Sequence, residues 1–183
     1  MPSDEQHAPL EPVQPVQPVQ PVEVVPGVWL RPATEQDLQA LVDLLAADQL
    51  GAARDGIRDD TDRAAYLGAF RAMDTDPAHL LMVAERDGRI VGTFQLSFLP
   101  GLARRGAWRS QIEAVRVAQS ERGSGLGTEL MRWAINESQR RGAVVVQLTS
   151  DRSRTAAHRF YRRLGFVDSH VGMKLRLGAD GGS

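Results

Sequence analysis

The sequence predicts an α/β (α+β) protein in which a mixed, mostly antiparallel central sheet of about seven strands carries about four helices on its faces. Short runs rich in β-branched residues predict the strands, and longer runs with apolar residues at helical spacing predict the helices. These runs follow the order strand, two helices, three strands, helix, strand, helix and two strands. Hydrophobic residues make up 42% of the 183-residue chain and charged residues 25%, which is ordinary for a soluble globular domain.

Both ends of the chain are predicted to lie outside the globular domain, which spans residues 28–177. Residues 1–26 form a tail with successive Pro-Val-Gln repeats, and proline at every third position favours extended polyproline II. We interpret this disordered tail as a solvated spacer, with a ligand for a proline-binding groove as the alternative. Residues 178–183 are rich in glycine and are expected to be a flexible end.

In the first part of the domain, the sequence predicts one strand and two helices. Residues 28–31 form a short apolar strand that a proline ends. Thr34 is a suitable N-cap for the first helix, and Asp37 completes a variant of the capping box. A second helix is predicted over residues 60–73, after a segment over 51–59 that is expected to be mobile.

A hairpin and a further strand come next. Residues 80–84 and 90–96 flank a turn that contains Asp87 and Gly88, a residue pair typical of tight hairpins. A polar loop containing arginines then leads to a strand over residues 111–118.

The last part of the domain begins with a long amphipathic helix over residues 125–141, which Gly142 ends. Residues 144–148 are almost all apolar, as expected of a strand that is covered on both faces. A final helix, capped by Ser153 or Asp151, is predicted to end at residue 164, and two short strands are predicted over 165–168 and 172–177.

Charge and composition exclude several classes of function. Lys and Arg number 22 against 23 Asp and Glu, so no net field would recruit nucleic acid or an anionic membrane. The absence of cysteine excludes disulfides, thiolate zinc sites and a cysteine nucleophile. His79 and His170 lack partners at metal-ligand spacing, so no metal is expected. Neither a membrane-spanning run nor a signal peptide is visible, and a cytoplasmic protein is therefore expected.

The sharpest local motif is a glycine-rich segment between a predicted strand and the start of a predicted helix. Glycines let the backbone approach a ligand closely, and the free N–H groups of a helix start favour an anion. It lacks the Gly-Lys-Ser/Thr end of a Walker A loop, because Thr128 follows Gly127 directly, and its glycine spacing differs from that of a dinucleotide fingerprint. We infer a phosphate or pyrophosphate site, with a ligand-free helix start as the alternative. The segment comprises Arg122, Gly123, Ser124, Gly125, Leu126, Gly127 and Thr128.

Three motifs in this order resemble the GNAT family of N-acetyltransferases. Residues 122–127 match the family's Gln/Arg-x-x-Gly-x-Gly/Ala loop, and residues 112–117 match the Ile-Glu-x-x-x-Val strand that precedes it. Residues 157–166 match the family's last helix, in which a Phe/Leu-Tyr pair comes before Gly-Phe. The resemblance covers nearly all of residues 28–177 and implies the GNAT fold.

The resemblance also implies a co-substrate and its binding residues. Acetyl-CoA would place its pyrophosphate on the 122–128 loop, and Val115 and Val117 would bond the pantetheine arm like an added strand. Arg154 stands where many members have asparagine, near the CoA, and an arginine there can pair with phosphate.

Acetyl transfer to an amine requires a base, stabilisation of an oxyanion and an acid for the departing thiolate. Glu113 is the candidate base, directly or through water; it is expected to share an apolar strand face with Val115 and Val117. The alternative is a surface or salt-bridged glutamate. Tyr161 is the candidate acid, with a packed core tyrosine as the alternative. A backbone N–H of residues 115–117 would donate a hydrogen bond to the oxyanion and stabilise it.

Other polar residues are weaker candidates. His158 in the last helix is expected to pack or to face solvent rather than to act in catalysis. Arg104, Arg105 and Arg109 would border the acceptor pocket by resemblance, where they could bind an anionic group of the substrate or be solvated. An acidic group that could attract a cationic amine comprises Asp55, Asp59, Asp60 and Asp62.

The sequence therefore predicts an acyltransferase that moves the acetyl group of acetyl-CoA to a primary amine of a small molecule, by direct attack in a ternary complex. A protein lysine or N-terminal acetyltransferase is the alternative within the same fold. A CoA-binding module without turnover is the alternative of another class. The expected partner is a small-molecule amine, with no nucleic acid and no membrane, and a homodimer is left open.

Overall fold

The computed structural model describes residues 18–47, 49–52, 54–175 and 177. The predicted flexible end and residues 1–17 of the predicted tail lie outside this part of the chain. The chain divides into two compact units, with the boundary between Leu148 and Thr149, and each unit is described by itself. No helix in the described ranges has both the length and the apolar character that a membrane crossing requires.

The first unit is built on one sheet, in which the described residues form six strands that follow chain order. They are β1 (Val22–Val25), β2 (Val28–Pro32), β3 (His79–Arg86), β4 (Arg89–Leu99), β5 (Trp108–Val117) and β6 (Ala143–Leu148). Neighbouring strands from β1 to β5 pair antiparallel, and β6 pairs parallel with β5. The predicted mixed, mostly antiparallel sheet is confirmed, with six described strands in place of about seven.

The first strand corrects the predicted boundary of the tail. Residues 22–25 were assigned to the tail, yet they form β1 and pair with β2, with Val22 opposite Leu30. The repeat with proline at every third position ends at Pro21. The Val-Glu-Val-Val run that follows contains no proline, so each residue has an N–H for strand pairing, and the run has high strand propensity. Gly27, at a φ of 73°, makes the turn into β2. The folded part of the chain therefore begins before residue 28.

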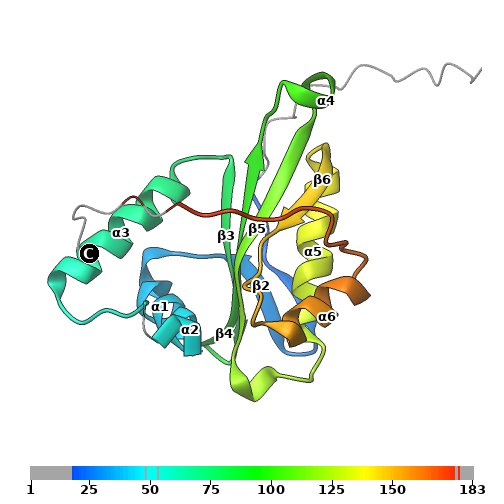
Figure 1. The fold of residues 1–183 in the computed structure, drawn as a ribbon. Coiled ribbons are helices and arrows are strands. Elements are labelled where there is room, and N and C mark those ends of the chain that lie inside the picture. The colour runs from blue at the N-terminus through cyan, green and yellow to red at the C-terminus, as the bar shows by residue number, and fades with distance from the viewer. Residues whose placement is uncertain (1–17, 48, 53, 176, 178–183) are drawn as a thin grey trace, which may run out of the picture. The chain divides into compact units, whose positions relative to one another are not determined.

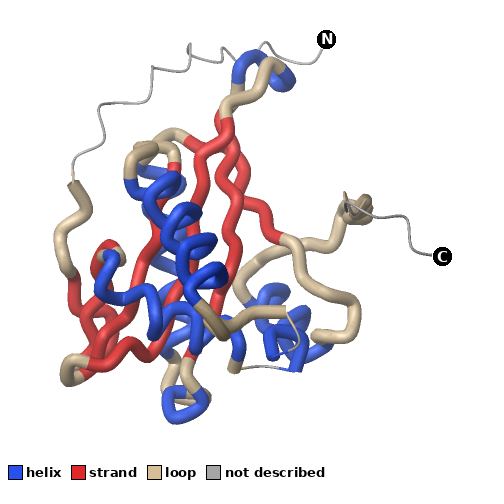
Figure 2. The backbone as a smooth tube through the Cα atoms, turned by 90° about the vertical axis from the view of Figure 1, so that its left-hand side faces the viewer, coloured by secondary structure: helices blue, strands red, loops and turns tan. Residues whose placement is uncertain are grey.

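One face of the sheet is covered by helices from the segment between β2 and β3 (Figures 1 and 2). This segment holds a 3-10 turn η1 (Glu35–Asp37) and the helices α1 (Leu38–Ala46), α2 (Gln49–Ala52) and α3 (Asp60–Asp74). The predicted cap is confirmed, because the Asp37 carboxylate accepts a hydrogen bond from the Thr34 N–H at 2.8 Å. The buried cluster beneath these helices contains Ala33, Leu38, Leu41, Phe70 and Val83.

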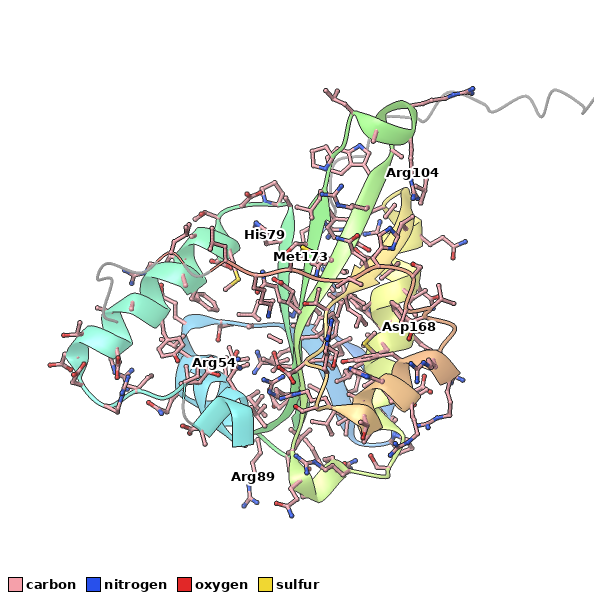
Figure 3. The ribbon with its side chains drawn as sticks, viewed as in Figure 1. Arg54, His79, Arg89, Arg104, Asp168 and Met173 are labelled. Atoms are coloured by element: carbon pink, nitrogen blue, oxygen red, sulfur yellow. The ribbon has the colours of Figure 1, made fainter. Side chains whose placement is uncertain are left out.

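The β3–β4 connection is the predicted tight hairpin. Asp87 and Gly88 both have positive φ, at 49° and 74°, as the mirror-image turns of hairpins require. The next connection differs from the predicted loop, because it contains the short helix α4 (Ala103–Gly106) at the end of a projecting β4–β5 hairpin (Figures 1 and 3). Arg104 and Arg105 in α4 have left-handed φ values of 56° and 61°.

The opposite face of the sheet is covered by α5 (Leu126–Arg140), the predicted long amphipathic helix. Its Leu126, Leu130, Met131 and Ala134 are fully buried. Trp133 packs on Phe94 of β4, with ring centroids 5.8 Å apart. The prediction that residues 144–148 are covered on both faces is wrong, because Val144 is 53% exposed.

The second unit contains the helix α6 (Thr155–Arg163). Its N-cap is Arg154, whereas Ser153 and Asp151 were predicted; Asp151 instead accepts bonds from the N–H and hydroxyl of Ser153, within the turn before the helix. The two strands predicted over 165–168 and 172–177 are wrong for the described residues, which form no strand there. Strands need a hydrogen-bonded neighbour, and here the apolar side chains stand open to solvent: Val167, Val171, Met173, Leu175 and Leu177.

Candidate functional site

The central feature of the first unit is a bulge in β5 at Ala114. Glu113 lies opposite Gln95 of β4, but the next matched pair is Arg116 with Thr93. Two residues of β5 therefore face one residue of β4, and Ala114 takes up the extra length with a φ of 53°. A bulge of this kind bends its strand and changes the direction of the following side chains. Positive φ is uncommon for alanine, so the surrounding ladder must impose it.

The bulge overturns the expected surroundings of Glu113. Simple alternation would place Val115 and Val117 on its face, but across the bulge Arg116 takes that face instead. The Glu113 side chain is exposed, and its cross-strand neighbour is the amide side chain of Gln95. The expected apolar strand face is therefore wrong, and Glu113 has a polar neighbourhood on the face that α1 and α3 cover.

Polar residues that the motif analysis did not single out lie along the same face. The Gln95 Nε2 donates to the Ser97 Oγ at 3.2 Å, and the Ser97 Oγ is hydrogen-bonded to Nδ1 of His79 at 2.8 Å. The sequence does contain a signal for the first two residues. Gln95 and Ser97, like Thr93 before them, are polar at alternate positions between apolar residues of β4, which marks one face of that strand.

On the other side of Glu113 the polar row continues into β6. Gln111 shares the face of Glu113 by alternation, and it accepts a hydrogen bond from Nε2 of Gln147 at 2.7 Å. The face thus carries hydrogen-bonding side chains across four adjacent strands, from β3 to β6, with the Glu113 carboxylate among them. Such a surface can hold a polar molecule close to a carboxylate.

Beyond the bulge, one edge of β5 is open among the described strands. The parallel pairing of β5 with β6 ends at the pair Ile112 and Leu148, whereas β5 continues to Val117. On its other edge β5 stays paired with β4, through Arg116 with Thr93 and Val117 with Gly92. The Val115 carbonyl accepts a hydrogen bond from Nη1 of Arg116 at 2.9 Å, and the other backbone groups of Val115 and Val117 that face the open edge could bind an extended ligand, as in strand addition.

The glycine-rich loop follows directly and leads into α5. A 3-10 turn η2 (Gln119–Glu121) comes first, and Gly123 and Gly125 then have φ values of 84° and 89°. A Cβ at either glycine would meet no atom within 4 Å, so both face open space. Gly125 is the N-cap of α5 and supplies no side chain to the helix start.

The loop contains backbone donors without a partner at and before the start of α5. Within the described chain, the N–H groups of Gly123, Gly125 and Gly127 donate no hydrogen bond, whereas the Leu126 N–H donates to the Ser124 Oγ at 3.3 Å. Arg122 is exposed beside them. Free N–H groups at the positive end of a helix, here the 15-residue α5, favour an anion. The loop therefore has backbone donors of the kind that bind a phosphate.

In the second unit, Tyr161 lies in an aromatic cluster on and after α6. Its ring centroid is 5.2 Å from that of Phe160 and 6.0 Å from that of Phe166. The Tyr161 side chain is half-buried, and so is that of His158 in the same helix. Arg154, at the N-cap of α6, donates its backbone N–H to the carbonyl of Asp151 at 3.0 Å. The geometry of this helix is compatible with both the acid and the packing role of Tyr161.

The remaining predicted residues fall into two groups. Arg104 and Arg105 are exposed at the projecting hairpin, and Arg109 is exposed at the start of β5. Three of the four acidic residues already have local partners. The Asp59 carboxylate caps α3 by accepting from the Asp62 N–H, Asp62 pairs with Arg58 at 2.9 Å, and Asp55 pairs with Arg54 at 3.4 Å. They are therefore not a free acidic patch for an amine.

The chain is similar to known proteins over most of its length. Residues 38–166 match the model of the acetyltransferase (GNAT) family. The aminoalkylphosphonate N-acetyltransferase of Salmonella typhimurium is 30% identical over 147 residues, which are 80% of this chain and 90% of that protein.

Solved structures show the same fold. A transcriptional regulator from Bacillus halodurans is 41% identical, with a TM-score of 0.78 over 82% of this chain and 99% of that chain. An acetyltransferase from Trypanosoma brucei is 28% identical, with a TM-score of 0.66 over 82% of this chain and 99% of that one. The family match, the relative and the shared fold together identify the chain as an N-acetyltransferase of the GNAT family.

Proposed function

We propose that the chain transfers the acetyl group of acetyl-CoA to the primary amine of a small polar molecule. The observation that carries this proposal is the continuity of one segment. Over residues 113–128 it provides a carboxylate, an open strand edge and a cluster of free N–H groups at a helix start. These are the groups that an amine, a pantetheine arm and a pyrophosphate require, in that order.

In the proposed reaction the amine nitrogen attacks the thioester carbonyl, and the C–S bond breaks as the tetrahedral intermediate collapses. Glu113 accepts a proton from the amine, directly or through water, because an alkyl ammonium is not nucleophilic. A backbone N–H of residues 115–117 stabilises the oxyanion. Tyr161 donates a proton to the CoA thiolate as it leaves. The products are an N-acetyl amide and CoA.

We assign CoA binding to the loop and to the open edge of β5. Within the 122–128 loop, Arg122 and the N–H groups of Gly123, Gly125 and Gly127 would hold the pyrophosphate. Val115 and Val117 would bond the pantetheine amides. Arg154 would add a contact to a phosphate. The chemistry of these donors fits an anionic, amide-containing co-substrate, and no metal enters the scheme.

The acceptor is proposed to be polar because the Glu113 face is polar. Gln95, Ser97 and Gln111 present amide and hydroxyl groups beside the carboxylate, which suit an amine that carries further hydrogen-bonding groups. A relative whose named substrates are aminoalkylphosphonates makes these compounds the first candidates to test.

The test is release of CoA thiol from acetyl-CoA with a panel of amines. We expect turnover with a small polar amine and with aminoalkylphosphonates before simple alkylamines. Turnover only with peptides would favour a protein acetyltransferase. Binding of acetyl-CoA in calorimetry without turnover on any amine or peptide would instead favour a CoA-binding module. Absence of acetyl-CoA binding would contradict the proposal outright.

A further inference from the structure

Arg86, the last residue of β3, connects two segments that are far apart in the sequence. Its Nε and Nη2 donate to the two carboxylate oxygens of Glu121, at 3.0 and 3.3 Å. Its Nη1 donates to the carbonyl of Pro26 at 3.1 Å. The Glu121 side chain is only 12% exposed, so solvent screens this bidentate pair less than an ordinary surface ion pair.

Glu121 in turn contacts the glycine-rich loop through its backbone. Its carbonyl accepts hydrogen bonds from the Ser124 hydroxyl at 2.8 Å and from the Ser124 N–H at 3.3 Å. The same hydroxyl accepts from the Leu126 N–H at the start of α5. An unbroken series of contacts therefore runs from the Arg86 guanidinium through Glu121 and Ser124 to the Leu126 N–H at the start of α5.

The loop needs such support for two physical reasons. Gly123 and Gly125 have no Cβ to limit their backbone, so an unsupported loop has many accessible conformations. In addition, the N–H groups of Gly123, Gly125 and Gly127 donate no hydrogen bond within the described chain, so no bond of their own fixes them before an anion binds. A loop that is already held in the binding conformation loses less entropy when the anion binds, and this increases affinity.

The same guanidinium fixes the turn between β1 and β2. The Pro26 carbonyl that it binds is followed by Gly27, where a Cβ would lie 3.1 Å from the Arg86 Nη1. The Gly27 N–H donates to the Glu23 carboxylate at 2.7 Å, which closes the turn. The first hairpin and the loop before α5 are thus tied to one residue at the end of a central strand.

We propose that Arg86 is a positioning residue for acetyl-CoA, which holds the 122–128 loop through Glu121 and couples that loop to the β1–β2 turn. The inference rests on the proposed function of the loop. Arg86 does not contact the co-substrate in this scheme; it acts through Glu121 and Ser124. Its contribution is therefore to acetyl-CoA affinity and not to the chemical step.

The test compares Arg86→Met with Arg132→Met, which removes an exposed arginine that pairs with Glu129 on α5. We expect Arg86→Met to weaken acetyl-CoA binding about tenfold in calorimetry, equivalent to one charge-assisted hydrogen bond. The KM for acetyl-CoA should rise by the same factor, while kcat and the KM for the amine stay at wild-type values. Arg132→Met should bind acetyl-CoA like wild type.

Two further variants test the route of the effect. Glu121→Gln should weaken binding as Arg86→Met does, and the double variant should be no weaker than either single one, because both remove the same contact. Arg86→Lys should restore part of the affinity. Amide hydrogen exchange over residues 121–128 should be faster in Arg86→Met without ligand.

The outcomes separate this inference from the proposed function. If wild type binds acetyl-CoA and Arg86→Met, folded at the assay temperature, binds it equally well, Arg86 is only a structural ion pair and the inference is overturned. If wild type itself binds no acetyl-CoA, the proposed function fails and the inference falls with it. A loss of kcat with unchanged acetyl-CoA affinity would also overturn the positioning role.

Discussion

Gln95 of β4 lies directly opposite Glu113 of β5, and the next matched pair, Thr93 with Arg116, is displaced by one residue because of the bulge at Ala114. This pairing gives the Glu113 carboxylate a polar face and leaves the following β5 residues with an open edge. Both features place the candidate base where a strand-like co-substrate and a polar amine could meet.

We predict that Glu113→Gln lowers turnover by roughly a hundredfold or more near neutral pH. The loss should shrink at high pH, because more of the amine is then already neutral. The measurement is a pH profile of kcat with the best acceptor from the amine panel. Glu129→Gln, on the surface of α5, is the control and should leave the profile unchanged. A wild-type profile for Glu113→Gln would mean that bulk water or another residue takes the proton.

We predict that Tyr161→Phe lowers turnover with little change in acetyl-CoA affinity. A phenol that protonates the leaving thiolate acts chiefly in the transition state, so its loss affects kcat more than binding. The alkaline limb of the pH profile should also disappear. The ring contacts with Phe160 and Phe166 survive this substitution, so the fold should be retained. Wild-type turnover with an intact alkaline limb would show that Tyr161 only packs.

Two glycines of equal backbone strain test the pyrophosphate site. Gly125 and Gly142 have φ values of 89° and 79°, and a Cβ at either would meet no atom within 4 Å. Valine at each position imposes a comparable conformational cost, but only at Gly125 does the side chain enter the expected ligand space. We expect Gly125→Val to lose acetyl-CoA affinity in calorimetry while Gly142→Val keeps it. Equal affinities in the two folded variants would remove the loop from the site.

Truncation tests the corrected boundary of the tail. A chain that starts at residue 18 should keep its turnover and melting temperature, because the repeat before it has few large apolar groups. A chain that starts at residue 28 should have a lower melting temperature and should bind acetyl-CoA more weakly. It lacks β1 and the Pro26 carbonyl that Arg86 binds. Equal loss in the two chains would show that the repeat itself docks on the domain.

Asp37 is expected to stabilise the fold in a pH-dependent way. Burial opposes its ionisation, but hydrogen bonds from Arg31 and Thr34 outweigh that cost and hold the pKa of Asp37 below its usual value. Its contribution is thus complete above the unfolded pKa of about 3.9 and is lost as the pH falls through the folded pKa.

Asp37→Asn should therefore lower the free energy of unfolding at pH 7 by about 2 kcal/mol. The difference from wild type should narrow below about pH 4. Denaturant unfolding of both proteins at several pH values measures the loss of free energy and its dependence on pH. Asp43→Asn, which removes an exposed carboxylate from α1, is the matched control and should have little effect at any pH. A pH-independent loss in Asp37→Asn would contradict the ionic explanation.

Local patterns predicted the elements that depend on local chemistry. The Asp87-Gly88 turn, the Thr34 cap with Asp37, and the glycine-rich start of α5 all appear where the sequence places them. Each depends on a few adjacent residues whose backbone preferences leave few alternatives. The fold class followed from these elements and from the order of apolar runs.

What could not be predicted depends on partners far away in the sequence. The bulge at Ala114 exists because β4 offers one residue where β5 offers two, and no local feature marks alanine for positive φ. For that reason the prediction that Glu113 shares an apolar strand face with Val115 and Val117 was wrong. The contact of Arg86 with Glu121 joins residues 35 positions apart, and β1 was missed because the proline repeat was extended past its last proline.

The extra residue at Ala114 also determines how β5 would tolerate a change of length. Before it, Ile112 faces α5; after it, Val117 does so, opposite Gly92. Deleting Ala114 would restore plain alternation, with Val115 opposite Phe94, while Arg116 would stay opposite Thr93 and Val117 opposite Gly92. The Arg116 guanidinium would therefore remain outside the apolar layer beneath α5. A single-residue deletion at the bulge would remove the bend of the strand without inverting its second half.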